Sequence, residues 1–208
     1  MSAADSPLFA RLSQVFEDGH CAPVDGLMSD ARFAVAERTA DAAVLIAVTD
    51  RGENEGGPGM LLTQRPTTMR DHPGQVAFPG GKLEPGEDAV AAALREAEEE
   101  LAITPAAVRV IGTTDRYQTG TGFDVTPVLG VVPPDLPLRA EPREVEAWFE
   151  VPLRLVLDRA QWTEHEVFWR GHMRQYLEMH YEGFRIWGVT AAIIANLSRR
   201  LDAEAVFR

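Results

Sequence analysis

The strongest structural signal in this 208-residue chain is the stretch GKLEPGEDAVAAALREAEEELAI, from Gly81 to Ile103. Its beginning belongs to a run dense in glycine and proline, Pro79 to Gly86, which predicts a loop of fixed shape. The following residues, Glu87 to Leu101, predict a helix. At about 100° per residue, a narrow arc of that helix carries an apolar seam for the core, formed by Val90, Leu94, Ala97 and Leu101.

The predicted helix and the turn before it are strongly acidic. Seven acidic side chains lie between Glu84 and Glu100, against the single base Arg95. On a helix, Glu96, Glu99 and Glu100 are related as i, i+3 and i+4, so we expect them to project from one face, roughly opposite the apolar seam. Like charges at that spacing repel, and a cation between them would relieve the repulsion. Oxygen ligands of this kind suit Mg²⁺ or Mn²⁺.

A solvated helix end is the simpler interpretation of such a glutamate cluster. Against it, Glu99 and Glu100 lie in the last turn of the predicted helix, where the negative end of the macrodipole disfavours carboxylates. Helix stability alone therefore does not account for these two residues. The helix favours the hypothesis of a divalent metal site, and magnesium held in this way typically acts on phosphates.

The residues before the helix add groups that could bind a phosphate. Gly80, Gly81 and Gly86 allow the backbone to approach a ligand closely, and a main-chain carbonyl there could be a further metal ligand. Basic side chains upstream could bind phosphate oxygens, with guanidinium groups acting as bidentate forks. Each base alone is typical of a surface or a salt bridge, and their combination with the acidic helix indicates an anionic substrate bridged by metal. These bases are Arg65, Arg70, His72 and Lys82.

Composition and charge argue against several other classes of function. The net charge is −12 with a pI near 4.8, and because so acidic a surface repels polyphosphate backbones, no nucleic-acid partner is expected. The longest apolar run, Ala42 to Val48, is far shorter than the roughly 20 residues that span a bilayer, so no membrane partner is expected. Cys21 is the single cysteine, and the N-terminus lacks an export signal pattern. We therefore expect a cytoplasmic protein with a small-molecule substrate.

Apolar patterns predict further elements along the chain. They predict a short helix at Pro7–Phe16 and a hairpin with a long loop, formed by strands at Ala42–Thr49 and Met60–Thr63. The aromatic-rich stretch Trp162–Tyr181 favours core packing, with a contribution to a pocket for the acyl chain of a substrate as the alternative. Strands mixed with helices indicate an α/β or α+β sandwich. The remaining predicted elements are strands at Val108–Gly112, Val125–Val132 and Val145–Phe149 and an amphipathic helix at Trp187–Leu201.

Gly81, Glu87 and the run Arg95–Ile103 together resemble the Nudix box. The pattern of that box is G-x5-E-x7-R-E-U-x-E-E-x-G-U, where U is aliphatic or small, and every charged position is matched. The one departure is Ala102, which stands where the pattern has glycine. Because that glycine caps the helix, we expect a changed helix end and an intact metal site.

Residues before the box resemble the signature of the coenzyme A diphosphatases within this family, although Pro66 stands where that signature has serine or alanine. The whole resemblance runs from about Ala42 to Leu197, so the first forty residues are weakly covered. The matching segments are Leu61-Leu62-Thr63-x-Arg65, Arg70, Gly74, Phe78-Pro79-Gly80-Gly81, TPVLG at 126–130, EVPL at 150–153 and IWGVTAAII at 186–194.

The resemblance implies an α/β fold, namely a Nudix-type α/β/α sandwich with a mixed β-sheet. We expect residues 41–208 to form the Nudix hydrolase domain and residues 1–40 to be an N-terminal extension packed on it. The implied reaction is metal-dependent hydrolysis of the diphosphate bond of coenzyme A or its derivatives. Its products are 4′-phosphopantetheine, or the acyl form, and adenosine 3′,5′-bisphosphate.

The resemblance also implies a cofactor, Mg²⁺ or Mn²⁺. Glu96, Glu99 and Glu100, with the Gly80 carbonyl, would hold one or more ions that neutralise the diphosphate and lower the pKa of a bound water. The general base is a separate question, because Nudix enzymes differ in where they place it. Glu99 is the first choice, and Glu144, just before the Val145 strand, is the alternative, with a solvated strand-end residue as its other interpretation.

Substrate binding falls to the bases upstream of the box and within it. Arg65 and Arg70 would clamp the diphosphate or the 3′-phosphate of the substrate. His72 could donate to a phosphate, and a structural loop histidine is an equally good interpretation. Lys82 is the remaining cationic candidate.

Two other functions stay open at this point. The residues of the Nudix box bind only the diphosphate and the metal. The substrate could therefore be another nucleoside diphosphate-linked compound such as ADP-ribose or NADH. The chain could also be a non-catalytic nucleotide-binding Nudix module. The presence of Glu96, Glu99 and Glu100 argues against the second of these, because such modules can lose the carboxylates of the box.

Overall fold

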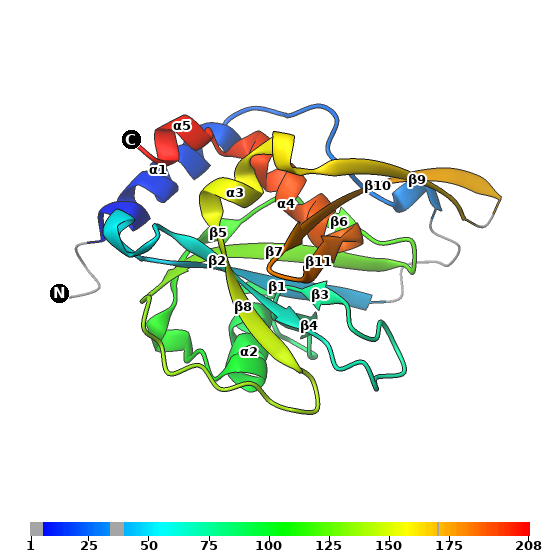
Figure 1. Ribbon diagram of the computed structural model, residues 1–208, viewed down its shortest axis with the longest axis horizontal. Coiled ribbons are helices and arrows are strands. Elements are labelled where there is room, and N and C mark those ends of the chain that lie inside the picture. Colours follow the sequence, from blue (N-terminus) through cyan, green and yellow to red (C-terminus); the bar gives the residue numbers. More distant parts are fainter. Residues whose placement is uncertain (1–5, 34–39, 170) are drawn as a thin grey trace.

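The computed structural model describes residues 6–33, 40–169 and 171–208, and Figure 1 shows the arrangement of its elements. The α-helices are α1 (Pro7–His20), α2 (Ala89–Leu101), α3 (Leu153–Leu157), α4 (Gly188–Arg200) and α5 (Ala203–Val206). The strands are β1 (Ala40–Thr49), β2 (Gly59–Gln64), β3 (Val76–Ala77), β4 (Gly80–Lys82), β5 (Arg109–Thr113), β6 (Tyr117–Gln118), β7 (Phe123–Val132), β8 (Ala147–Pro152), β9 (Thr163–Trp169), β10 (His172–Tyr181) and β11 (Phe184–Trp187). Within the described ranges, no helix has both the length and the apolar character that crossing a membrane requires.

A mixed sheet is built around β1. β7 runs parallel to β1 along its whole length. On its other side β1 has two antiparallel partners, because β4 pairs with its first half and β2 meets it where Val48 pairs with Met60. β2 continues to pair with β8 and β3, and β7 pairs with β5 and β6. The predicted pairing of the first two long strands is therefore confirmed.

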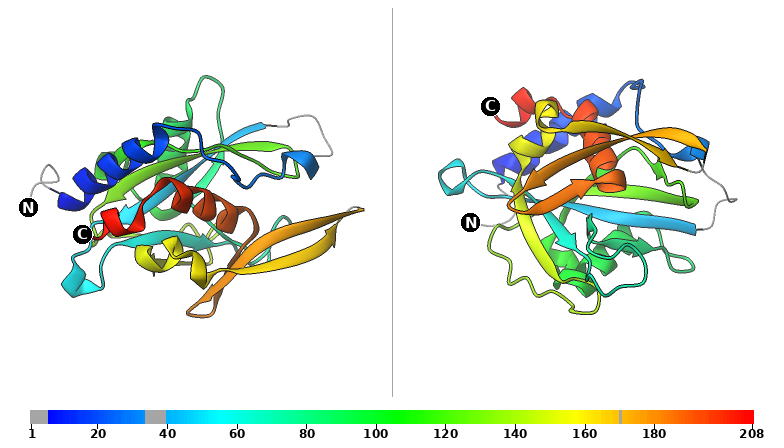
Figure 2. Two further views of the ribbon diagram at one scale, coloured as in Figure 1. Left: turned by 90° about the horizontal axis from the view of Figure 1, so that it is seen from above. Right: turned by 45° about the vertical axis from the view of Figure 1, so that its right-hand side comes forward.

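Helices cover both faces of this sheet (Figures 1 and 2). Leu45 of β1 packs in one apolar cluster with Ala97 and Leu101 of α2, whereas the next residue, Ile46, packs in another with Ile194 of α4. Helix α1 also belongs to the α4 cluster. Because helices cover both faces, β1 and β7 are apolar over most of their length. The predicted α/β/α sandwich with a mixed sheet is confirmed.

The Gly- and Pro-rich run before α2 is a strand over part of its length. Gly80–Lys82 forms β4, which pairs with Ala42–Val44 of β1. Glycine permits this pairing, because a Cβ on Gly80 would lie 2.5 Å from the Ala43 carbonyl oxygen. The prediction of a loop over the whole run is therefore wrong at β4, where glycine marks a close approach of two strands.

The buried side of α2 is displaced from the predicted seam. The helix begins after Asp88, whose side chain accepts a hydrogen bond from the Ala91 N–H at 2.8 Å. Of the four residues expected in the seam, Ala97 and Leu101 are fully buried, whereas Val90 and Leu94 are only half-buried. Small side chains at the contact let α2 lie close to β1 and β4; the buried apolar residues are Ala92, Ala93, Ala97 and Leu101.

The C-terminal third departs further from the sequence predictions. The predicted amphipathic helix exists as α4, but every residue from Thr190 to Leu197 is buried. The stretch expected to pack in the core forms instead the β9–β10 hairpin, which projects from the body (Figures 1 and 2). Its base packs on the core through Met179, whereas Phe168 and Met173 pair near its tip and are 70% and 56% exposed.

The N-terminal segment packs on α4 and α5. Helix α1 extends to His20, beyond the predicted end at Phe16. The buried Arg200 guanidinium donates to the Asp115 carboxylate at 2.7 and 2.8 Å and to the Gly19 and Ala22 carbonyls at 2.9 and 2.7 Å. This arginine connects the last turn of α1 and the segment after it to the end of α4. Residues 1–5 and 34–39 of the proposed extension lie outside the described ranges, and the division at residue 40 stays a prediction.

Ala102 ends α2 in the manner of a glycine. Its φ of 59° and ψ of 29° are left-handed, and its N–H donates to the Glu98 carbonyl at 2.9 Å. The next N–H, of the buried Ile103, reaches the Ala97 carbonyl at 3.2 Å. The expectation of a changed helix end is therefore wrong, because hydrogen bonds and the burial of Ile103 hold alanine in a conformation that disfavours a Cβ.

Ala102→Gly is expected to stabilise the protein by about 1 kcal/mol, because glycine removes the Cβ strain of the left-handed conformation. Thermal and urea unfolding measure the change in the free energy of unfolding. Ala91→Gly is the matched control, since Ala91 is an exposed residue with helical geometry in the same helix, and we expect it to destabilise. A loss of stability in Ala102→Gly would contradict the strain argument.

Candidate active site

Three carboxylates from two segments meet beside α2. Glu96 and Glu100 come from the helix and Glu144 from the loop that precedes β8, and each offers an oxygen within 4.8 Å of the others. Glu100 is 4% exposed, Glu96 is half-buried and Glu144 is exposed. The group is therefore buried on the helix side and open on the side of Glu144. We call these three residues the carboxylate cluster.

Burial of the cluster strongly disfavours its negative charge. The pKa of Glu100 is raised to about 8, chiefly because the carboxyl is removed from water, and the nearby Glu144 and Glu96 add to the rise. A hydrogen bond from the Gly80 backbone and the positive charge of Arg65 act in the opposite direction. Burial likewise raises the pKa of Glu96. Concentrated oxygen donors whose charge is unbalanced suit a divalent cation such as Mg²⁺ or Mn²⁺.

Two glycines of β4 make room for these side chains. A Cβ on Gly81 would lie 2.3 Å from Glu96 Oε1 and 2.5 Å from its carboxyl carbon. Gly80 has the close contact with β1 described above, and its backbone also bonds to Glu100. The glycine at the start of the motif is thus a steric requirement of the carboxylate cluster. The role of the neighbouring Gly80 carbonyl as a metal ligand stays a prediction.

Arg95 holds the acidic residues of the helix in place. Its Nε and Nη2 donate to the two oxygens of Glu87 at 3.0 and 3.1 Å, and Nη2 also donates to the Lys82 carbonyl at 3.1 Å. Its Nη1 donates to Glu96 at 2.9 Å and to Glu99 at 3.0 Å. Glu87 and Arg95 are therefore positioning residues that link β4 to α2 and orient Glu96.

The structure separates Glu99 from the other two helix glutamates. Its side chain is 57% exposed and pairs with Arg95, one turn earlier on the helix. Glu96 and Glu100 are also one turn apart and share the side that faces β4. The expectation that all three converge roughly opposite the apolar seam is wrong, because Glu100 lies on the buried side of α2 and Glu144 completes the cluster. Whether Glu99 joins a metal or acts as a base stays a prediction.

A bracket formed by residues 139–146 brings Glu144 to the cluster. At one end, the Arg139 and Glu141 N–H groups donate to the Leu101 and Glu100 carbonyls at 3.0 and 2.9 Å. At the other end, Val145 is buried. The bracket thus satisfies carbonyls at the end of α2 that lack a helical partner. Glu144 is forty-four residues from Glu100, so helical spacing could not predict the meeting.

A loop between β2 and β3 lies beside the cluster. The Arg65 N–H donates to the Gln75 carbonyl at 2.9 Å, and the Thr67 N–H donates to Glu146 Oε2 at 2.9 Å, which fixes the loop to the bracket. Arg65 is half-buried, and its buried Nε has no hydrogen-bond acceptor among the described residues. The Arg65 guanidinium therefore lies beside the cluster and could donate a hydrogen bond from Nε to an anionic group bound there.

The other predicted substrate-binding residues are spread around this loop. Arg70 and His72 are exposed within it, and His72 has a left-handed φ of 54°. Lys82 is exposed on β4, with its ammonium 5.4 Å from the centroid of the Phe123 ring. Contacts of these three side chains with a substrate stay predictions.

Comparison with known proteins gives the family. A family model for the NUDIX domain matches residues 39–170. The chain is 47% identical over 164 residues to the uncharacterized Nudix hydrolase NudL of Escherichia coli strain K12, which covers 78% of this chain and 83% of that protein. This chain belongs to the Nudix hydrolases.

Two solved structures share the fold of this Nudix hydrolase. RenU, a Nudix hydrolase from M. smegmatis, has a TM-score of 0.54 and 22% identity, covering 84% of this chain and 92% of its own. A Nudix hydrolase from Alicyclobacillus acidocaldarius has a TM-score of 0.52 and 20% identity, covering 84% of this chain and 98% of its own.

Family membership gives the general reaction. Nudix hydrolases cleave phosphorus-containing anhydrides, and this chain is an enzyme of that family. Such enzymes generally use divalent metal ions. The carboxylate cluster fits that requirement, because it offers three oxygen donors whose charge the protein leaves partly unbalanced.

Gly81→Ala is expected to weaken cation binding by about tenfold or more, because the new Cβ displaces the Glu96 carboxylate. Titration with Mn²⁺, followed by its paramagnetic resonance signal, measures the affinity, and thermal unfolding monitors stability. Gly52→Ala is the control, since a Cβ there lies 3.8 Å from the nearest atom. Mn²⁺ affinity in Gly81→Ala equal to that of the natural protein would show that Glu96 does not depend on this glycine.

Proposed function

We propose that this Nudix hydrolase is a metal-dependent coenzyme A diphosphatase. It cleaves the diphosphate bond of coenzyme A or its derivatives to 4′-phosphopantetheine, or the acyl form, and adenosine 3′,5′-bisphosphate. The observation that carries the proposal is the coenzyme A diphosphatase-like signature from Leu61 to Gly81, whose β2–β3 loop is hydrogen-bonded to the bracket that presents Glu144.

The charges around the cluster support a diphosphate with further negative groups. Arg65 acts electrostatically on Glu100, and its buried Nε has no acceptor among the described residues, which supports a role for Arg65 in binding an oxygen of the diphosphate. Arg70 and His72 are exposed on the same loop and suit the 3′-phosphate, which lies outside the reacting group. A substrate with one more phosphate than ADP-ribose or NADH gains most from these extra cations.

The carboxylate cluster would hold Mg²⁺ or Mn²⁺, with the Gly80 carbonyl as a further ligand. When bound, such an ion neutralises the diphosphate and makes water a better nucleophile. The chain itself supplies positioning: Arg95 orients Glu96, and the Gly80 backbone orients Glu100. Phosphoryl chemistry demands mainly such positioning and charge stabilisation from the protein.

Glu99 is proposed as the general base, with Glu144 as a metal ligand. The separation of Glu99 from the cluster supports this division, because a base needs an oxygen that no metal occupies. Arg95 donates to Oε2 of Glu99, and Oε1 has no hydrogen bond within the described part of the chain. Glu144 as the base, with Glu99 turned toward the metal, is the alternative.

Glu99→Gln and Glu144→Gln distinguish the two roles. We expect Glu99→Gln to lower kcat by about 100-fold with little change in Mn²⁺ affinity, as loss of a general base does. We expect Glu144→Gln to weaken Mn²⁺ binding by about tenfold or more and to recover part of its activity at high Mn²⁺. Steady-state kinetics at several Mn²⁺ concentrations measure both effects. The reverse pattern would assign the base to Glu144.

The substrate is tested by chromatography of coenzyme A, ADP-ribose and NADH after incubation with the enzyme and Mg²⁺ or Mn²⁺. We expect coenzyme A to be cleaved with the highest kcat/KM and to yield adenosine 3′,5′-bisphosphate. Glu100→Gln is expected to lower kcat/KM by about 100-fold or more, because it removes a buried carboxylate ligand. Glu98→Gln is the matched control, since Glu98 is exposed on the same helix outside the cluster.

Each other outcome rejects a stated part of the proposal. Faster cleavage of ADP-ribose or NADH would retain the Nudix chemistry and reject coenzyme A as the substrate. Tight nucleotide binding without turnover, unchanged in Glu99→Gln, would indicate a non-catalytic binding module.

A further inference from the structure

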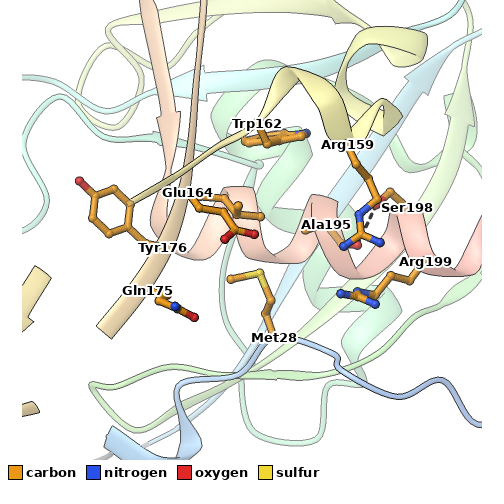
Figure 3. Close-up of a pocket in the computed structure, with 10 residues that line it drawn as sticks. Met28, Arg159, Trp162, Glu164, Gln175, Tyr176, Ala195, Ser198 and Arg199 are labelled. Carbon is orange, nitrogen blue, oxygen red and sulfur yellow. Dashed lines mark hydrogen bonds between the residues drawn. The ribbon is translucent and has the colours of Figure 1, made fainter. Parts of the chain in front are cut away.

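A second candidate binding site lies on the opposite side of the sheet from the carboxylate cluster. A pocket of about 200 Å³ opens between α4 and the β9–β10 hairpin (Figure 3). Met28 from the segment after α1 closes another side. Because α2 and α4 pack on different faces of the sheet, this pocket is separate from the cluster.

Two arginines direct their guanidinium groups into this pocket from different elements. Arg159 comes from a 3₁₀ turn, η5 (Arg159–Gln161), and Arg199 comes from α4 (Figure 3). Neither has an ion pair with any of residues 6–33, 40–169 and 171–208. Arg199 lies against the backbone at Gly26, where a Cβ would be 3.6 Å from its Nη1. Two guanidinium groups that share one pocket and have no carboxylate partner in the described part of the chain suit an anion.

An indole ring and a thioether line the pocket beside these guanidinium groups. The indole of Trp162 is fixed because its Nε1 donates to the Val156 carbonyl at 2.9 Å. Figure 3 shows Trp162 and Met28 on opposite sides of the pocket. Met28 is held to α4 by Asn196, which accepts from its N–H at 2.7 Å and donates to its carbonyl at 3.0 Å. An aromatic ring and a thioether that line one pocket suit a planar aromatic ligand.

Glu164 restricts the ligand further. This residue of β9 points its carboxylate into the pocket, on the side away from the two guanidinium groups in Figure 3. A bare anion gains from Arg159 and Arg199 but is repelled by Glu164. A ligand with an anionic group at one end and an N–H donor on its planar body satisfies all three side chains.

We propose that this pocket binds a nucleoside monophosphate whose base carries an exocyclic amino group. The phosphate binds Arg159 and Arg199, the base stacks on Trp162, and the amino group donates to Glu164. The site is additional to the catalytic one and requires no metal, because its cations are side chains. It gives the enzyme a place to sense a nucleotide while the carboxylate cluster is occupied.

The test is calorimetric titration of the metal-free enzyme, in excess chelator, with three probes: adenosine 5′-monophosphate, adenosine and inorganic phosphate. We expect the monophosphate to bind most tightly and to change the fluorescence of Trp162, with a matching loss in Trp162→Leu. Arg159→Gln and Arg199→Gln are each expected to weaken its binding by about tenfold. Arg154→Gln is the control, because it removes an exposed arginine five residues away that stacks on Phe207, outside the pocket.

Glu164→Gln supplies a test in the opposite direction. We expect this variant to bind inorganic phosphate more tightly, because a repelling charge is removed. The ratio of its affinity for adenosine 5′-monophosphate to its affinity for inorganic phosphate is therefore expected to fall. The absence of monophosphate binding, or binding that the two arginine variants leave unchanged, would overturn the proposal. Binding lost in Glu100→Gln and retained in Arg159→Gln would likewise overturn it, because the nucleotide would then occupy the catalytic site.

Discussion

The candidate active site depends on the close approach of α2 to β4. Glu96 occupies the space that a Cβ on Gly81 would need, and Glu100 is buried where the backbone of Gly80 can donate to it. Both carboxyls are thereby removed from water, which raises their pKa values. An acidic pair in such a place takes up either a proton or a cation. The packing of the helix on the sheet therefore also buries the two carboxyls in a position where a divalent ion would stabilise their negative charge.

Sheet topology makes the room for this approach. β1 has two antiparallel partners on one side, because β2 meets it at Met60 and then continues along β8 and β3, while β4 pairs with its other half. The loop after β2 carries Arg65, and the bracket before β8 carries Glu144. A hydrogen bond from the Thr67 N–H of the loop to Glu146 of the bracket connects the two segments. Residues far apart in the sequence thus meet at the place where β2 and β4 diverge.

The sequence predicted the parts of this arrangement that are local. Helical spacing placed Glu96 and Glu100 one turn apart, and the long apolar runs predicted β1 and β7. It did not predict β4, because glycine usually indicates a turn and the strand depends on contact with β1. The position of Glu144 depends on hydrogen bonds from the bracket to carbonyls at the end of α2, which no periodicity encodes. The contact of Glu99 with Arg95 is local, because the two residues lie one turn apart on α2, and this ion pair holds Glu99 away from the cluster.

The two faces of the sheet carry opposite electrostatic imbalances. Other arginines of this acidic chain have carboxylate partners. Arg51 pairs with Glu150, and Arg200 pairs with Asp115 through two hydrogen bonds. With 32 acidic residues against 20 basic ones, a shortage of carboxylates does not explain why Arg159 and Arg199 have no ion pair within residues 6–33, 40–169 and 171–208. On the α2 face the unbalanced groups are carboxylates, which call for a cation. On the α4 face, two guanidinium groups without an ion pair among the described residues lie beside a fixed indole, and this arrangement suits a ligand whose anionic group binds them while Glu164 occupies another part of the pocket.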